Sequence, residues 1–345
     1  MQLYIHNQSR QLAGIVEAYD YFRWTRRYSR CGSFELRAIA TDKNLELLRI
    51  GNIVRKDDDD EAGLIEFVEL TGGESEFILV IGRFATSFLS RRIVWNTETL
   101  SEDLGAAIGT LLQNNLINPS DISRRIFGIE YAPATLNAPV NTQITFKNLM
   151  TAITDLCDGL DVGIKTVFEP TSGLFTITPY IGVDSQAVFS REFENIIEQV
   201  LTQSIMDYAT LALVAGEGEG AERIVVPVGG GEGEERHEVY VDARDLRSED
   251  LPDYVTALTF RGQTRLAELA KIEAFDVTVN PHGNLTYKLD YDIGSKIQAV
   301  SKRWGVALTA RITAIEESYD KEGMSLSVTF GKPILTLTEK LRREN

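Results

Sequence analysis

The C-terminal third of the chain alternates apolar and polar residues at the two-residue period of a β-strand. Three such runs, at 297–300, 306–312 and 325–330, are separated by turn residues, the last of them Asp-Lys-Glu-Gly at 320–323. Strands this short cannot bury their apolar faces alone. We therefore predict that they curl into a small barrel or sandwich.

The first 92 residues show the same strand pattern. Strands are expected at 2–5, 14–28, 33–39, 52–56, 64–70 and 76–85, with one helical turn at 43–48. The acidic run from Asp57 to Glu61 lies between two of these strands. It lacks the ligand spacing of a calcium-binding loop, so a solvated hairpin tip is favoured over a calcium site.

Between residues 97 and 180 the pattern becomes mixed. Leu100, Leu104 and Ile108 recur at helical spacing, which predicts a helix over 97–116 with Glu102 and Asp103 in its first turn. The further elements expected are a strand at 125–131, a helix at 146–157 stopped by Gly159, and a hairpin of strands at 162–168 and 174–180. Together they predict an α/β module.

Strand patterns return beyond residue 184. Strands at 207–215, 223–228 and 237–241 flank two glycine-rich loops, and a helix at 252–271 and a strand at 275–279 follow. We interpret this as a second, interrupted barrel that opens near 204–244 and closes at 293–340, with a last strand at 334–338. The predicted domains are a first barrel at 1–92, an α/β insertion at 93–203 with 245–274, and a second barrel at 204–244 with 275–345. The predicted class is α+β, mainly β.

Composition narrows the functional classes. The chain has 345 residues, 43% of them hydrophobic, so two or three domains are expected. It has no run of eighteen apolar residues, and its N-terminus lacks the pattern of a signal peptide, which predicts synthesis in a cytoplasm and no membrane partner. The net charge of −16 disfavours binding to nucleic acid, because phosphate contacts need clustered Lys and Arg.

Residues with catalytic potential form no recognisable site. His6, His237 and His282 have no zinc-binding spacing, and the two cysteines, Cys31 and Cys157, are expected to be reduced and to pack as small hydrophobes. The glycine loop at 216–220 precedes a strand rather than a helix, so a strand-to-strand loop is favoured over a phosphate site. We therefore predict no catalytic residue, no metal site and no cofactor.

One basic, aromatic cluster occurs near the N-terminus. It contains Arg23, Arg26, Arg27 and Arg30, with Trp24 and Tyr28 interleaved. Strand alternation places Arg26 and Arg27 on opposite faces, so the arginines do not form one continuous patch of positive charge. Nucleic-acid contact, subunit contact and ordinary strand packing all stay open.

The order of residues resembles a known family. The matching stretches are YDIG at 291–294, RWGV at 303–306, ARITAIEESYD at 310–320 and SVTFGKPILTL at 327–337. The resemblance is to the baseplate hub proteins of siphovirus tails, of the ReqiPepy type found in Gram-positive phages and prophages. It extends to the N-terminal hub region of tail-associated lysins. The family-like structural residues are Trp24, Arg26, Arg27, Tyr28, Gly32, Phe34, Gly218, Gly220, Arg223, Gly294, Trp304, Gly305, Arg311 and Gly331.

The resemblance implies a structural virion protein rather than an enzyme. Three copies would form a ring in which two barrels per chain give six similar units around a lumen for viral DNA. Its partners would be the six-fold tail tube or distal tail ring and a tail fibre or tip protein. The protein would be assembled in the host cytoplasm and located at the tail tip. Because the chain ends at Asn345, any wall-degrading enzyme is expected to be a separate protein.

Two alternatives from other classes stay open. A cell-wall or polysaccharide hydrolase would use two of the many carboxylates, whose separation in space the sequence does not give. A host receptor or carbohydrate-binding module would use the aromatic residues and glycine-rich loops.

Overall fold

Most strands belong to one continuous sheet in the computed structural model, which describes residues 1–73, 75–251 and 253–331. The N-terminal strands of this sheet are β1 (Leu3–His6), β2 (Leu12–Val16), β3 (Tyr21–Arg27), β4 (Ser33–Ile39), β5 (Ile53–Lys56), β6 (Ala62–Thr71) and β7 (Phe77–Phe84). The C-terminal strands are β13 (Asp184–Ser190), β14 (Ile196–Ser204), β18 (Ile272–Val279), β19 (Lys296–Ser301), β20 (Val306–Asp320) and β21 (Gly323–Gly331).

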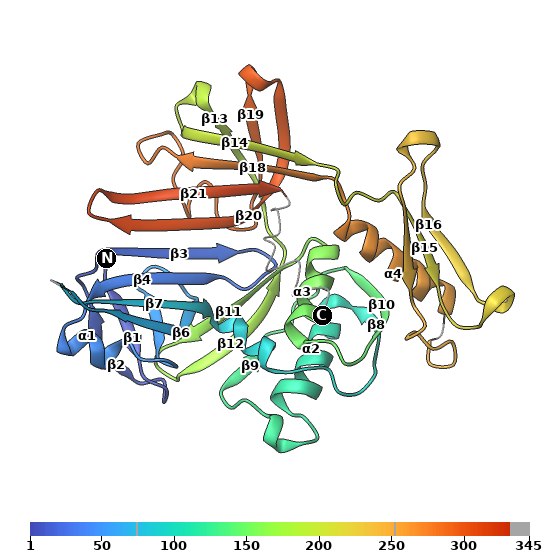
Figure 1. The fold of residues 1–345 in the computed structure, drawn as a ribbon, viewed down its shortest axis with the longest axis horizontal. Helices are drawn as coiled ribbons and strands as arrows, with labels where there is room; N and C mark the ends of the chain where they lie inside the picture. Colours follow the sequence, from blue (N-terminus) through green and yellow to red (C-terminus); the bar gives the residue numbers. More distant parts are fainter. Residues whose placement is uncertain (74, 252, 332–345) are drawn as a thin grey trace.

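The pairing order divides this sheet into two halves. It runs β14-β18-β21-β20-β3-β4-β7-β6-β5-β1-β2, with β19 beside β20 and β13 beside β19. Figure 1 shows β21, β20, β3 and β4 lying side by side at the place where the halves meet. The mainly-β, α+β class is confirmed, and the two strand-rich ends of the chain form the two halves of one sheet.

The N-terminal half curls around its own core. All seven strands contribute apolar side chains to it, and Phe22, Trp24 and Phe34 are its largest buried members. The predicted helical turn is confirmed as α1 (Asp42–Leu47), capped by Thr41. The prediction of one strand over 14–28 is wrong, because this stretch contains β2, which pairs with β1, and β3, which pairs with β4 and β20.

The C-terminal half encloses a second core, in which Phe189, Phe275 and Phe330 are fully buried. The turn predicted at 320–323 is confirmed, since Asp320 pairs with Gly323 across it. The strand predicted at 306–312 continues to Asp320, because its second half pairs with both β21 and β3. The strand predicted at 334–338 lies outside the described residues.

The strands predicted to open the second barrel, near 204–244, are not paired with it. They form a separate sheet of order β16-β15-β17, made of β15 (Leu211–Ala215), β16 (Val225–Gly229) and β17 (Glu238–Asp242). This sheet packs on α4 (Tyr254–Glu268), which buries Val214, Val228 and Leu258 in a core of their own. Strands β13 and β14 instead pair with the C-terminal half, where Phe189 and Ile196 join its core.

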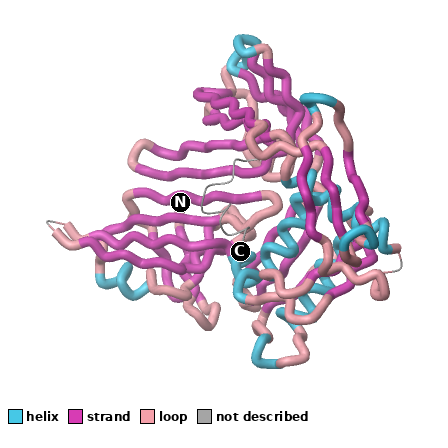
Figure 2. Tube along the Cα trace, turned by 45° about the vertical axis from the view of Figure 1, so that its right-hand side comes forward, coloured by secondary structure: helices cyan, strands magenta, loops and turns pink. Residues whose placement is uncertain are grey.

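The middle module contains the mixed elements. Its helices are α2 (Leu104–Leu112) and α3 (Leu149–Gly159), and its strands are β8 (Glu98–Asp103), β9 (Ile129–Tyr131), β10 (Pro139–Ile144), β11 (Gly163–Glu169) and β12 (Leu174–Tyr180). The helix 146–157 and the hairpin at 162–180 are confirmed within a few residues. Figure 2 shows most helical segments gathered beside the stack of strands.

The helix predicted over 97–116 begins later than expected. Glu98–Asp103 is a strand paired with β10, and Asp103 caps α2 by accepting hydrogen bonds from the amides of Gly105 (3.0 Å), Leu136 (3.1 Å) and Ala138 (3.0 Å). These bonds hold the pKa of Asp103 below its ordinary value, although burial opposes them. Within the described ranges, no helix is long and apolar enough to span a membrane.

Candidate functional site

The two sheet halves and the middle module meet around the C-terminal end of β3. Strand β3 pairs with β20 over six residues, from Phe22 opposite Tyr319 to Arg27 opposite Ala314, and this pairing joins the two halves. The acidic run 57–61 and the loop before β19 both contact this end of β3. We call this region, centred on Arg26, the junction.

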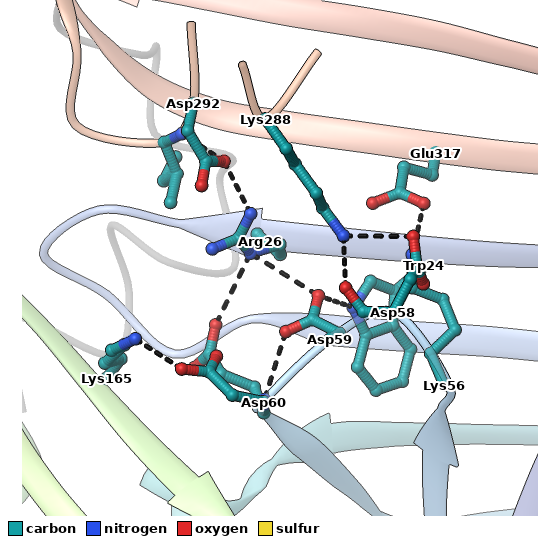
Figure 3. A network of polar contacts seen from close by, with 12 residues as sticks. Trp24, Arg26, Lys56, Asp58, Asp59, Asp60, Lys165, Lys288, Asp292 and Glu317 are labelled. Atoms are coloured by element: carbon teal, nitrogen blue, oxygen red, sulfur yellow. Dashed lines mark hydrogen bonds and ion pairs between the residues drawn. The ribbon is translucent and has the colours of Figure 1, made fainter.

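Arg26 is a buried cation that contacts segments far apart in the sequence (Figure 3). Its side chain is only 7% exposed, and Nη1 donates to Asp292 Oδ1 (2.6 Å) and to the Tyr287 hydroxyl (3.1 Å). Nε lies 3.5 Å from Asp59 Oδ2 and 3.8 Å from Glu61 Oε2. Burial opposes the charge, but the surrounding acidic groups outweigh it and raise the pKa of Arg26.

The acidic run is not simply a solvated hairpin tip, so that prediction is wrong for two of its members. The Asp59 side chain is 1% exposed and accepts a hydrogen bond from Trp24 Nε1 (2.9 Å), and Glu61 is also buried. The physical reason is the buried Arg26, whose charge must be balanced by nearby anions. In Figure 3 Asp59 faces Arg26 from one side and Asp292 from the other, while Asp58 and Asp60 pair with Lys288 and Lys165.

A second buried ion pair joins the halves beside Arg26. Lys56 on β5 pairs with Glu317 on β20, and both side chains are excluded from solvent. Glu317 also accepts hydrogen bonds from the hydroxyls of Tyr319 (2.5 Å) and Tyr287 (3.1 Å). Lys56 further contacts Asp58 (2.8 Å), so the pair is embedded in a fully bonded network.

The charge state of Glu61 depends on pH in the neutral range. Burial, with repulsion from Asp59, raises the pKa of Glu61 to about 8, although Arg26 acts in the opposite direction. Glu61 is therefore harder to ionise than an exposed glutamate, even though Arg26 lies 3.8 Å away.

The middle module is fastened to the same end of β3. The Tyr28 hydroxyl donates to the carbonyl of Asp161 (3.0 Å) and accepts from the amide of Gly182 (2.9 Å). Arg311 of β20 binds the Asp161 carboxylate through two nitrogens, at 2.6 and 2.5 Å, and lies over the Tyr28 ring. Arg30 pairs with Asp158 at 2.7 Å. These contacts tie three parts of the chain into one unit.

The structure brings some of the family-like residues together and separates others. Arg26, Tyr28, Gly294 and Arg311 lie at the junction. Three of the others, Trp24, Gly32 and Phe34, lie in or against the N-terminal core. Arg27 lies on the outer face of β3, Trp304 and Gly305 lie in the turn before β20, and Gly331 ends β21. Gly218, Gly220 and Arg223 belong to the loop between β15 and β16 of the separate sheet.

Gly294 shows why a glycine is needed at the junction. Its φ is +81°, and a Cβ there would lie 2.6 Å from the Tyr28 ring. Its carbonyl accepts a hydrogen bond from Arg311 Nη1 (2.7 Å). The YDIG stretch therefore packs directly against the residue that fastens the middle module.

Several junction residues were missed from the sequence: Lys56, Asp59, Glu317, Lys288 and Asp292. A signal for two of them was present. Glu317 shares strand parity with Ile315 and Tyr319, and Lys56 shares it with Val54. Opposite charges on two inward faces predict a buried pair only when the two strands are known to be close.

The cysteines and histidines form no reactive centre at the junction. Burial raises the pKa of Cys31 to about 12 and also raises that of Cys157, so both thiols are poor nucleophiles. Over residues 1–73, 75–251 and 253–331, no group of three or more His, Cys, Asp or Glu side chains is arranged to hold a metal ion.

Comparison with known families decides the identity of the chain. The family model described as Siphovirus ReqiPepy6 Gp37-like protein matches residues 2–332. The chain belongs to this family. The resemblance seen in the sequence is thereby confirmed, and the matched range includes every element of the junction.

Solved structures share the fold of this family member over nearly their whole length. The 43 kDa tail protein of prophage MuSo2 from Shewanella oneidensis has a TM-score of 0.64 at 12% identity, with 96% of this chain and 98% of that chain covered. The tail protein from Neisseria meningitidis MC58 has a TM-score of 0.62 at 12% identity, with 96% of each chain covered. The prophage tail protein gp18 from Listeria monocytogenes EGD-e has a TM-score of 0.57 at 13% identity, with 99% and 97% covered. No curated protein sequence matches the chain significantly.

Proposed function

We propose that this protein is a structural hub at the tip of a siphovirus or prophage tail. The observation that carries the proposal is the pairing of β3 with β20, which joins two barrel-like halves into one sheet. Each chain thus holds two strand-built units side by side, one from β1–β7 and one from β13, β14 and β18–β21. The fold shared with prophage tail proteins supports this assignment.

The two units suit a symmetry-matching role. In this proposal three chains form a ring whose six units face the six-fold tail tube or distal tail ring on one side. A tail fibre or tip protein would bind the other side. A permanent ring of this kind needs an interface on the order of 2,000 Å² or more for each contact.

The junction suits a rigid connection between the two units of each chain in such a ring. Its buried ion pairs link β3, β5, the acidic run and β20, so the two units of one chain are held at a defined angle. The net charge of −16 would repel the phosphates of DNA that passes through a lumen, so the DNA would not bind there. The protein would be assembled in the host cytoplasm and incorporated into the virion.

A catalytic role is not part of the proposal. The buried carboxylates of the junction are already engaged by Arg26 and Lys56, which leaves them unsuited to a glycosidase pair. Turnover of purified host wall that is lost on mutating one acid would support the hydrolase alternative instead. Capture of host cells by the isolated protein would support the receptor-binding alternative.

Sedimentation equilibrium tests the proposal. The purified protein, alone or mixed with the neighbouring tail ring protein, is expected to have the mass of three chains. A particle that stays monomeric at high concentration in the presence of its neighbours would contradict it.

A further inference from the structure

The separate three-stranded sheet contains a short internal repeat. Residues 218–228 read GEGAERIVVPV and residues 231–241 read GEGEERHEVYV, which are identical at seven of eleven positions. Each copy forms the same structure. A 3-10 turn (Gly220–Glu222 or Gly233–Glu235) follows a glycine of positive φ and leads into a strand, β16 or β17. The two strands flank β15 on either side.

The repeat places two acidic loops at opposite ends of the sheet. Because β16 is antiparallel to β15, one loop lies beyond Ala215 and the other lies beyond Leu211, about 15 Å away along a five-residue strand. Figure 1 shows the two loops at the two ends of the β15–β16 pair. Between them, on the face turned away from α4, Leu213 lies opposite Pro227 on one side and Tyr240 on the other.

This outward face is apolar in the middle, where Arg223 lies over the Tyr240 ring, and has more carboxylates than cations at both ends. The arginines of the two loops, Arg223 and Arg236, are already paired with Asp242 and Glu238. Tyr240 is 56% exposed, and Leu213 and Val225 are exposed as well. Five exposed carboxylates in the loops have no ion-pair partner among the residues that the structure describes: Glu219, Glu222, Glu232, Glu234 and Glu235. We call this surface the acidic face.

A surface of opposite character lies on the middle module, near the 3-10 turns Ala85–Arg91 and Ile122–Arg124. Trp95 is 49% exposed and Phe127 is 67% exposed, and Ile93 and Ile122 are exposed beside them. Figure 1 shows the turns that follow α2 at the lower edge of the view, away from β15 and β16. We call this surface, together with its four arginines Arg91, Arg92, Arg124 and Arg125, the basic patch.

The basic patch is held in place by the protein itself. Arg92 Nε donates to the carbonyl of Arg124 (2.5 Å), and Arg124 Nη2 donates to the carbonyl of Ile93 (2.6 Å). The Arg124 guanidinium lies 4.3 Å from the centroid of the Trp95 ring. Within the described part of the chain, none of the four arginines has a carboxylate within ion-pair distance. The patch also contains one exposed carboxylate, Asp121, which accepts a hydrogen bond from the Ser123 amide and lies near Arg124. In a protein of net charge −16, four arginines without an ion pair around exposed aromatic rings are still a marked local exception.

We infer that the acidic face of one copy docks on the basic patch of a second copy. The charges are complementary, and each surface has an apolar part whose burial would drive association. Arg, Trp and Tyr are also the residue types that dominate binding energy at protein interfaces. Since the two surfaces differ and lie on different parts of one chain, the contact is head to tail, which is the type that closes into a ring. The inference rests on the proposed function and names the contact between copies.

Charge reversal with rescue tests this contact. One variant carries Glu219→Lys with Glu232→Lys, one change in each loop, and a second carries Arg91→Glu with Arg125→Glu. Neither Arg91 nor Arg125 donates a side-chain hydrogen bond within the described chain, and each contacts one aromatic ring, Phe88 or Phe127. The melting temperature of the variant is measured alongside, to check that it folds. Each variant is expected to weaken self-association at least tenfold by sedimentation equilibrium, and a chain with all four changes is expected to recover it.

Matched controls separate the contact from net charge. Glu46→Lys with Glu69→Lys, and Lys43→Glu with Arg303→Glu, make the same changes of charge at exposed positions on other parts of the surface. They are expected to leave association unchanged.

Three outcomes would overturn the inference. A wild-type ring that tolerates both reversals would refute this contact while leaving the proposed hub intact. A wild type that stays monomeric with its neighbouring ring protein would refute both. Duplex DNA that binds the wild type but not the R91E/R125E variant in fluorescence anisotropy, with association unaffected by either reversal, would assign the basic patch to nucleic acid.

Discussion

The junction and the acidic face use the same residue types in opposite ways. At the junction, Asp59, Glu61 and Asp292 surround one buried arginine, and Asp59 and Glu61 are themselves buried. On the acidic face, five exposed glutamates project from two loops and have no ion pair among the described residues, because Arg223 and Arg236 in the same loops pair with Asp242 and Glu238 instead. Carboxylates thus form ion pairs within the chain in one region and remain exposed, available for binding a partner, in the other. The environment, and not the residue type, decides which role a carboxylate has.

Removing Arg26 is expected to have the largest effect on stability. Arg26→Met would leave Asp59 and Asp292 without their buried cation, and the free energy of unfolding is expected to fall by about 3–5 kcal/mol. The midpoint of urea denaturation measures this. Arg23→Met is the control, because Arg23 lies on the same strand but is exposed and makes only long ion pairs of 3.4 and 3.7 Å. It is expected to cost less than about 1 kcal/mol. Equal losses in the two variants would contradict the assigned role of Arg26.

The Lys56–Glu317 pair is expected to show strong coupling. Lys56→Met alone leaves Glu317 buried and unpaired, and should cost about 2–4 kcal/mol. Adding Glu317→Gln removes that charge and should recover part of the loss, which a double-mutant cycle measures as a coupling energy. Strictly additive losses would show that the two side chains do not depend on one another.

Gly294 tests how closely the YDIG stretch packs on Tyr28. Gly294→Ala is expected to cost about 1–3 kcal/mol, because it combines a positive φ with a contact at 2.6 Å. Gly305→Ala is the matched control, since Gly305 also has a positive φ (+65°) but no atom within 4 Å of its Cβ position. The difference between their melting temperatures isolates the contact. Equal shifts would show that backbone strain alone explains both.

Glu61 is expected to make stability depend on pH. Its pKa is raised from 4.5 to about 8, so between these values the folded chain keeps a proton that the unfolded chain loses. The free energy of unfolding therefore falls as pH rises through this window. Glu61→Gln, which is always neutral, should flatten this slope and stabilise the protein by about 1–2 kcal/mol near pH 8. Exposed Glu69→Gln should leave the slope unchanged, and an unaltered slope in Glu61→Gln would contradict the assignment.

Local sequence patterns were sufficient to locate most of the strands. Alternation gave the right location of β4, β7, β12 and β21, because one face of each is buried and the period is strict. The start of α2 was misplaced because Leu100 and Leu104 satisfy both helical spacing and strand parity. The amides of Leu136 and Ala138, more than thirty residues away, make Asp103 the cap. No local window contains that information.

The amino-acid sequence by itself determined the class, the two strand-rich ends and the family, since these depend on periodicity and on short motifs read in order. The tertiary structure alone decided that β3 pairs with β20, that Asp59 and Glu61 of the acidic run turn inward, and that the strands at 211–242 form a sheet of their own. The reason is physical. Periodicity states which face of a strand is buried, whereas the partner of that face, and the charge it must neutralise, are set by residues hundreds of positions away.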